Sequence, residues 1–322
     1  MNAKEKIDVL TDNIEKIIVG KKETVRLTVA SLIAGGHVLL DDVPGTGKTK
    51  LARSIARSVN VSFRRIQFTP DLLPSDITGL SVYSPKTGEF EFKPGPVFTH
   101  ILLADEINRA TPRTQAGLLE CMEEKQVSLD GVTRPLEEPF FVIATQNPVE
   151  TSGTFPLPQA QMDRFLMKLS MGFPEKEEEY QILERFAKDE PLETLEPVLT
   201  GEDILSLRKE ASMVFASNEM LDYIANIIMA TRKNDKILSG CSPRGSLALL
   251  RSARALALMA GRNYIVPEDI KELAVPVLAH RLILAHSYAG TAQSQDLIQN
   301  ILNEVPVPTE KFDTASARQA MS

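Results

Sequence analysis

The sequence contains little cysteine or histidine, and this limits the chemistry available to it. Only two of its 322 residues are cysteines, Cys121 and Cys241, and their spacing fits neither a disulfide framework nor a metal site. The four histidines form no cluster of metal-ligand type either: His37, His100, His280 and His286. We therefore predict that these six side chains have structural roles.

Long apolar runs and an excess of basic charge are also missing. No run approaches the roughly 20 apolar residues of a membrane helix, and residues 1–6 lead into a charged amphipathic pattern rather than a signal sequence. We therefore expect a soluble, cytoplasmic protein without a membrane span. The net charge of −7, with both signs mixed along the chain, argues against a broad basic face for nucleic acid, although an oligomer could still gather lysines in a ring pore.

The composition is that of an ordinary globular protein, 43% apolar and 25% charged, with enough length for two domains. The first half alternates short apolar runs with helical patterns, which indicates an α/β fold with a parallel sheet covered by helices on both faces. The predicted strands cover residues 37–40, 63–68, 98–104, 140–145 and 165–169. A helix is predicted over residues 49–59.

Two hairpin-like segments lie between the predicted strands. Residues 82–92 turn at Lys86–Gly88. Residues 126–138 turn at Asp130–Gly131, a typical two-residue hairpin turn.

The pattern changes after Pro174, where a charged helix begins at Glu175. Residues 191–197 have the composition of a linker, and almost everything beyond them is predicted to be helical. Ser242-Pro243 indicates a helix start, with Ser as N-cap and Pro in the first turn. The residues expected to point inward from this helix are Leu247, Leu250, Ala253 and Leu256. The tail beyond Val305 is expected to be mobile.

Residues 43–49 have the pattern of a phosphate-binding loop. The motif Gly-x-x-x-x-Gly-Lys-Ser/Thr needs small residues so that successive backbone N–H groups can point at phosphate oxygens. Asp42 occupies the position of its first glycine. The loop follows a predicted strand and opens a predicted helix, whose N-terminus favours anions. We therefore predict that the chain binds ATP through Pro44, Gly45, Thr46, Gly47, Lys48, Thr49 and Lys50.

An acidic site further along the chain indicates hydrolysis. The apolar strand that starts near residue 98 ends in Asp105 and Glu106. Asp105 is placed to hold the water shell of Mg²⁺, and Glu106 to orient or deprotonate the attacking water. Asn147 ends the next strand and can fix the water or detect the γ-phosphate. The alternative for Asn147 is a simple Asn-Pro turn.

Two arginines are candidates for contact with phosphate. Arg164 precedes the last predicted strand, where it would lie on the surface of its own subunit and could reach a neighbour's nucleotide. Arg244 lies in the first turn of a predicted helix, which is an unfavourable place for a cation unless it faces phosphate. The alternative for both is a surface salt bridge.

The order of these motifs resembles that of AAA+ ATPases. The amino-acid sequence of the motifs themselves resembles the MoxR family, and this resemblance extends over nearly the whole chain. The segments that carry the resemblance are residues 41–49, 105–110, 144–148 and 161–165. In that family Asp is common in place of the first glycine, so Asp42 does not count against nucleotide binding. The resemblance implies a P-loop αβα core over residues 1–175, a linker over 176–196, an all-helical lid over 197–305 and a tail over 306–322.

The resemblance also implies a role for each motif. Lys48 and Thr49 of the Walker A loop serve the phosphates and Mg²⁺, and Asp105 and Glu106 form the Walker B motif. The residues implied to sense the nucleotide or complete the site are Asn147 as sensor 1, Arg164 as a trans-acting finger and Arg244 as sensor 2. The residues implied to lie against adenine are Val19 and Gly20.

The implied partners are protein subunits and protein clients. The two hairpin-like segments fit the helix-2 insert and pre-sensor-1 hairpin of the clade that includes magnesium chelatase subunits and minichromosome-maintenance helicases. Such ATPases form homo-oligomeric rings, usually hexamers. The MoxR family is thought to act as chaperone-like machines on proteins with von Willebrand factor A domains.

Two alternatives remain open at this stage. A nucleic-acid motor is one, because related clades grip DNA with the same inserts, and the first insert contains Lys86 and Lys93. The other is a regulatory ATP-binding switch that retains Glu106 but turns over slowly.

Overall fold

The computed structural model describes residues 1–148, 153–187, 191–285 and 291–308. Its centre is a five-stranded parallel sheet in the order β2-β5-β8-β1-β9. The strands are β1 Val38–Asp41, β2 Phe63–Gln67, β5 Ile101–Asp105, β8 Phe141–Gln146 and β9 Met167–Leu169. All five correspond to predicted strands, which confirms the parallel α/β class. The prediction that β5 begins at Phe98 was wrong, because residues 95–99 turn back on themselves through a hydrogen bond from Phe98 N to Gly95 O.

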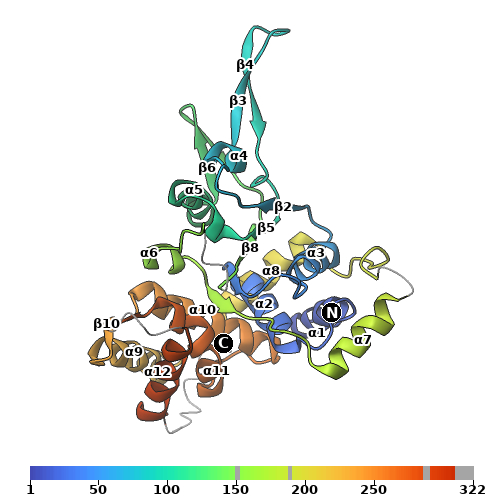
Figure 1. Cartoon of the computed structure of the whole chain (residues 1–322). Helices are drawn as coiled ribbons and strands as arrows, with labels where there is room; N and C mark the ends of the chain where they lie inside the picture. The colour runs from blue at the N-terminus through green and yellow to red at the C-terminus, as the bar shows by residue number, and fades with distance from the viewer. Residues whose placement is uncertain (149–152, 188–190, 286–290, 309–322) are drawn as a thin grey trace.

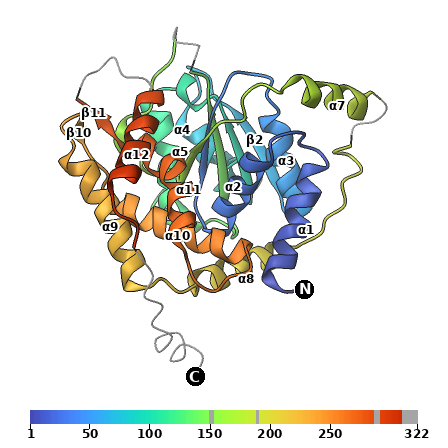
Figure 2. The same cartoon turned by 90° about the horizontal axis from the view of Figure 1, so that it is seen from below.

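Helices cover both faces of the sheet, as the αβα prediction required (Figure 2). The central strands are apolar throughout, so successive residues feed two separate hydrophobic cores. One core packs the sheet against α1 Ala3–Glu15, α2 Lys22–Ile33 and α3 Lys48–Ser58. The other packs it against α4 Pro74–Thr78 and α5 Pro112–Glu124, which follows the 3₁₀ turn η1 Ile107–Arg109.

Both predicted hairpins form and stand together at one end of the molecule (Figure 1). The first pairs β3 Gly79–Ser84 with β4 Glu89–Pro94, and the second pairs β6 Gln126–Leu129 with β7 Val132–Pro135. The second turns at Asp130 and Gly131, both with positive φ, as a two-residue hairpin turn needs. Ser81 Oγ donates a hydrogen bond of 2.5 Å to the Asp130 carboxylate and so joins the two hairpins.

The second half of the chain is helical, which confirms the predicted C-terminal helical lid. Helix α6 Gln159–Met162 precedes β9, and α7 Lys176–Phe186 lies in the predicted linker. The lid helices are α8 Gly201–Ser212, α9 Asn218–Lys233, α10 Pro243–Met259, α11 Pro267–Leu278 and α12 Thr291–Glu304. The 3₁₀ turn η2 Ala279–Arg281 and the short antiparallel pair β10 Ile237–Ser239 and β11 Ile283–Leu284 complete it. Helices α8 and α10 pack against α1 and α2, so lid and sheet share one hydrophobic core. Most of the predicted tail, residues 309–322, lies outside the described residues.

Helix α10 begins as predicted, and the inward positions predicted for Ala253 and Leu256 are confirmed, but the start of its buried face differs. Ser242 is its N-cap, accepting a hydrogen bond from Arg244 N, and Pro243 is its first residue. The prediction that Leu247 points inward was wrong, because Leu247 is 58% exposed. Gly245, Ala248, Leu249 and Ser252 are buried in its place, so the first half of the inward face is made mainly of small residues. Small residues let α10 approach its neighbours closely, and a Cβ added at Gly245 would lie 3.3 Å from the Arg281 side chain.

Within the described part of the chain, no helix is long and apolar enough to cross a bilayer.

Candidate functional site

Predicted nucleotide-binding residues gather where the central strands end, at the carboxyl edge of the sheet. Lys48 opens α3 after the loop that follows β1, Asp105 ends β5 and Glu106 follows it. Partial burial lowers the pKa of the Lys48 ammonium, and the charges of Asp42, Asp105 and Glu106 oppose this shift. The structure therefore brings one lysine and a group of carboxylates together, and we call Lys48, Asp105 and Glu106 with their loops the phosphate edge.

The predicted phosphate-binding loop is shaped by two glycines. Gly45 and Gly47 have φ values of 88° and 91°, in the left-handed region that favours glycine, and Gly47 is the N-cap of α3. Pro44 and Gly45 are exposed, so the outer side of the loop is open. The Lys48 ammonium folds back over the loop and donates to the carbonyls of Asp42 at 2.8 Å and Val43 at 2.9 Å.

The remaining loop residues complete this geometry. The Thr46 hydroxyl donates weakly to Val43 O at 3.4 Å. Thr49 and Lys50 occupy the first turn of α3, where backbone N–H groups lack helical partners and attract anions.

Asp42 has a structural reason to replace the first glycine of the motif. Its carboxylate is buried and accepts three hydrogen bonds from the segment that follows β9. The donors are Ser170 Oγ at 2.7 Å, Met171 N at 2.5 Å and Gly172 N at 3.0 Å. Asp42 therefore fixes the start of the phosphate loop to the end of β9, which glycine could not do.

Neighbouring strands hold the two acids after β5. The Thr145 hydroxyl donates to Asp105 Oδ1 at 2.6 Å and accepts from Glu106 N at 2.8 Å, so one side chain of β8 contacts both acids. Arg65 Nη2 donates to Asp105 Oδ2 at 2.6 Å, and Gln67 Nε2 donates to Glu106 Oε2 at 2.9 Å. Glu106 also pairs with Arg109 Nη1 at 3.2 Å, which together with Gln67 fixes its carboxylate.

Sequence reasoning missed Arg65, Gln67 and Thr145. The first two lie on the edge strand β2, and Gln67 pairs with Asp105 in the register of β2 and β5. The only available signal was a pair of polar residues two apart in a predicted strand, which places them on one face without saying which strand they adjoin.

Asn147 lies at the same edge, directly after β8. It is buried, and its backbone carbonyl accepts from Asn108 Nδ2 at 3.4 Å. The residues that follow it, 149–152, lie outside the described residues. Its role in sensing phosphate or water stays a prediction.

Helix α7 lies beside the segment predicted to contact adenine. Val19 is buried, and Gly20 has a φ of 73°. The Glu178 side chain of α7 lies so close to Gly20 that an added Cβ would fall 2.1 Å from it, and Glu178 pairs with Lys21 at 3.1 Å. At the other end of α7, the Phe186 ring lies 3.4 Å from the Lys50 ammonium. Helix α7 therefore connects both ends of the predicted nucleotide-binding region.

The two arginines predicted to contact phosphate both pair with one carboxylate outside the phosphate edge. Arg164 Nε lies 3.1 Å from Glu123 Oε2, and Arg244 Nη2 donates to Glu123 Oε1. One carboxylate on α5 thus binds both guanidinium groups. We call Glu123, Arg164 and Arg244 the arginine corner.

The arginine corner lies towards the amino edge of the sheet. His37 immediately precedes β1, and its ring Nε2 donates to Met122 O at 3.1 Å, because Val142 N donates to its Nδ1. His37 O also accepts from Leu166 N at 2.8 Å, two residues after Arg164. The four residues of β1 alone separate these contacts from the phosphate loop by roughly 13 Å, at about 3.3 Å per residue. The two groups of candidate residues therefore lie at opposite edges of one sheet.

The described cysteines and histidines are packed in cores or hydrogen bonded. Burial lowers the pKa of His37 to about 4 and raises the pKa values of Cys121 and Cys241 to about 12 and about 11, so these groups are neutral near pH 7. His280 is buried and His100 contacts Ser62 Oγ at 2.8 Å. His286 lies outside the described residues.

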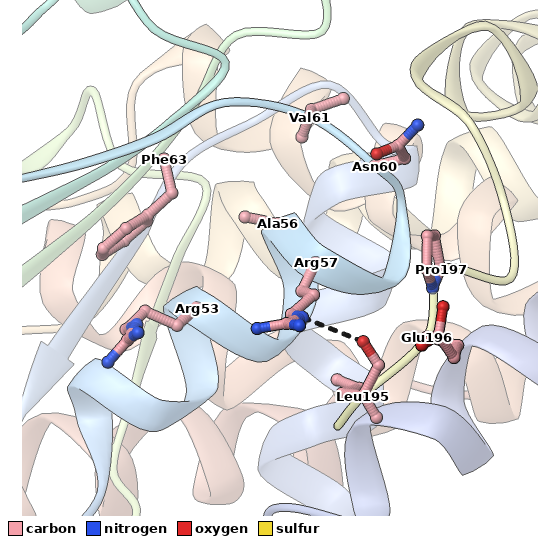
Figure 3. Close-up of a pocket in the computed structure, with 9 residues that line it drawn as sticks. All are labelled: Arg53, Ala56, Arg57, Asn60, Val61, Phe63, Leu195, Glu196 and Pro197. Atoms are coloured by element: carbon pink, nitrogen blue, oxygen red, sulfur yellow. Dashed lines mark hydrogen bonds between the residues drawn. The ribbon is translucent and has the colours of Figure 1, made fainter. Parts of the chain in front are cut away.

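A separate cavity of about 450 Å³ lies along the second half of α3 (Figure 3). Arg53 and Arg57 line it on the helix, and residues 195–197 line it opposite. Arg57 Nε donates to Leu195 O at 2.9 Å, which fastens part of the predicted linker to α3. Because Lys48 begins the same helix, this cavity is at the far end from the phosphate loop and is not part of it.

Comparison with known proteins agrees with this geometry. Residues 37–167 match the model of the ATPase family associated with various cellular activities (AAA), and residues 229–301 match the AAA lid domain. Proteins named MoxR are similar over nearly the whole length: that of Paracoccus denitrificans is 33% identical over 91% of this chain and 93% of its own. The chain belongs to the MoxR family of AAA ATPases.

Other relatives of this AAA ATPase are closer in sequence. The protein YeaC of Bacillus subtilis is 49% identical over 93% of this chain and 94% of its own. A Mycobacterium tuberculosis protein named Chaperone MoxR1 is 41% identical over 92% of this chain and 80% of its own. A solved structure from Cytophaga hutchinsonii superposes with a TM-score of 0.87 at 40% identity, covering 95% of this chain and 96% of its own.

As a member of this AAA family, the chain binds a nucleotide and hydrolyses ATP. Proteins of the AAA family are typically oligomeric.

Proposed function

We propose that this ATPase works as a ring, probing and remodelling protein partners with energy from Mg²⁺-dependent ATP hydrolysis at the junctions between subunits. The observation that carries the proposal is the separation of the phosphate edge from the arginine corner. A chain whose phosphate-binding lysine and phosphate-seeking arginines lie at opposite edges of its sheet can combine them only with a second copy. A closed ring, in our proposal a hexamer, repeats that contact at every junction.

The phosphate edge has the groups that hydrolysis needs. Lys48 would release its two loop carbonyls to contact the phosphates, and backbone N–H groups at the start of α3 would bind phosphate oxygens. Glu106, held in place by Gln67 and Arg109, would orient and deprotonate the attacking water.

Mg²⁺ fits this edge because Thr49 and Asp105 offer hydroxyl and carboxylate oxygens, the ligands that Mg²⁺ prefers. When bound with ATP it would neutralise charge on the β- and γ-phosphates. Asp105 would then give up its contact with Arg65, whose side chain is half exposed and also donates to Gln67 Oε1 at 2.9 Å.

The neighbouring subunit would supply the arginine corner. Arg164 and Arg244 would stabilise charge that develops on the γ-phosphate during transfer, where such an arginine contributes factors of about 10³ to 10⁵. Asn147 would detect the γ-phosphate from within the subunit that binds it.

A protein client is favoured by the hairpins and by the relatives. Tyr83 and Phe90 are 53% and 73% exposed and pack edge to face at 5.6 Å on the first hairpin. Exposed aromatic pairs are typical of protein-binding surfaces. Lys86 and Lys93 on the same hairpin are balanced by Glu89 and Glu91, so it offers little net charge to nucleic acid.

The name of the Mycobacterium tuberculosis relative supports a chaperone-like activity. Among clients, we propose proteins with von Willebrand factor A domains, on the family resemblance described above.

A substrate-trapping experiment tests this proposal. Glu106→Gln should bind ATP and stall, so with ATP it should retain a purified von Willebrand factor A domain protein that Lys48→Ala releases. Equal retention by both variants, or retention without ATP, would contradict ATP-driven remodelling. A DNA mobility shift that weakens steeply with salt would favour the nucleic-acid motor instead.

A further inference from the structure

We propose that Glu123 is a positioning residue for hydrolysis in the neighbouring subunit: it binds Arg164 and Arg244 at once and presents them as a pair. This inference rests on the proposed function, in which those arginines act in trans. Glu123 itself would not contact the nucleotide.

The contacts leave both arginines able to bind phosphate. Glu123 gives one oxygen to each guanidinium, Oε2 to Arg164 Nε and Oε1 to Arg244 Nη2. Within the described residues, the two Nη groups of Arg164 have no hydrogen-bond partner, and a guanidinium has five N–H donors in all. The carboxylate can therefore hold one edge of each arginine while other N–H groups reach a phosphate.

A carboxylate is needed because the fold forces two like charges together. Asp163 Oδ2 accepts from Ser242 Oγ at 3.0 Å, which fixes the start of α10 beside the residue that precedes Arg164. Arg244 lies two residues after Ser242, so both guanidinium groups come to the same place. Their repulsion, and the unfavourable position of Arg244 in the first turn of a helix, are offset by the negative charge of Glu123.

The backbone that carries Arg164 is held by hydrogen bonds from the lid. Arg281 is buried and donates from Nε to Asp163 Oδ1 at 2.8 Å and from Nη2 to Phe165 O at 2.6 Å. These bonds join η2 of the lid to the segment that carries Arg164. The side chains above this base remain partly open, at 33% exposure for Glu123, 30% for Arg164 and 43% for Arg244.

The test compares Glu123→Gln, which keeps the size and removes the charge, with Glu124→Gln. Glu124 is the exposed next residue on α5, outside the arginine corner. We expect Glu123→Gln to lower kcat at least tenfold, with ATP affinity by calorimetry unchanged because the phosphate edge is intact. Glu124→Gln should retain full kcat. Glu123→Asp keeps the charge and should recover part of the lost rate.

Two further measurements separate positioning from a general structural role. Adding Glu123→Gln to Arg164→Ala should cause little further loss, because Glu123 acts through the arginines. Mixing Glu123→Gln with Lys48→Ala subunits should restore part of the activity, because the Lys48→Ala subunits contribute intact arginine corners.

The outcomes distinguish this inference from the proposed function. If Arg164→Ala mixed with Lys48→Ala regains activity but Glu123→Gln retains full kcat alone, or loses it without rescue, Glu123 does not position the arginines and trans hydrolysis still stands. If Arg164→Ala retains full kcat or is not rescued, trans hydrolysis itself is contradicted.

Discussion

The phosphate edge and the arginine corner are both clusters of charge, but they are built in different ways. At the phosphate edge each predicted functional residue lies at the end of a buried strand or in the segment after it, and the parallel sheet brings Lys48, Asp105 and Glu106 to one side. At the arginine corner, Glu123, Arg164 and Arg244 come from three elements far apart in sequence and are joined by side-chain contacts. The first cluster is fixed by backbone topology, and the second depends on how α5, the approach to β9 and α10 dock.

This difference has a mechanical consequence. Arg281 and Ser242 both bind Asp163, so the lid holds the segment that carries Arg164 directly. A lid movement would shift the arginine corner while leaving the phosphate edge in place.

The largest expected effect is at the phosphate edge. Lys48→Ala should abolish ATP binding, because the phosphates lose their principal cation. Titration calorimetry measures the affinity directly, and an unchanged value would remove Lys48 from the site. The same variant should still serve as a donor of arginines, since its arginine corner is intact.

Arg164→Ala should impair hydrolysis without impairing ATP binding. ATP affinity should be unchanged, while kcat falls by about 10³ to 10⁵ as transition-state charge loses its partner. Steady-state ATPase assays beside calorimetry measure the two effects. A large loss of affinity with unchanged kcat would mean that the arginine corner is not a separate half-site.

Glu106→Gln should lower kcat by about 10² to 10⁴ and preserve ATP binding, because an amide cannot take a proton from water. Single-turnover hydrolysis with bound ATP isolates this step. Full turnover would exclude Glu106 as the base and direct attention to the regulatory-switch alternative.

The smallest expected effect concerns the scaffold of the phosphate edge. Asp42→Gly would make the loop match the strict motif, yet we expect it to lower the free energy of unfolding by about 2–3 kcal/mol, because Met171 N, Gly172 N and Ser170 Oγ lose a charged acceptor. Urea denaturation measures this. Asp42→Asn is the matched control and should cost less, since an amide oxygen can still accept; equal stability of all three proteins would show that the contacts are unimportant.

Much of this molecule followed from pattern, and the errors have physical causes. The central strands were predictable because buried parallel strands are largely apolar, and the second hairpin because Asp130-Gly131 suits a turn with two positive φ values. The inward face of α10 was not, because Leu247, Ala248, Leu249 and Leu250 offer several apolar stripes. Close packing selected the one with small residues, which leaves Leu247 exposed.

The sequence by itself determined the family and predicted the nucleotide site, because a phosphate loop and paired acids are local motifs placed at the ends of strands. Only the tertiary structure decided what holds them: Asp42 bound to the end of β9, Gln67 opposite Glu106, and Glu123 between two arginines. Such pairs join residues 39 to 130 positions apart. No local pattern encodes them, because they depend on strand register and on the docking of whole helices.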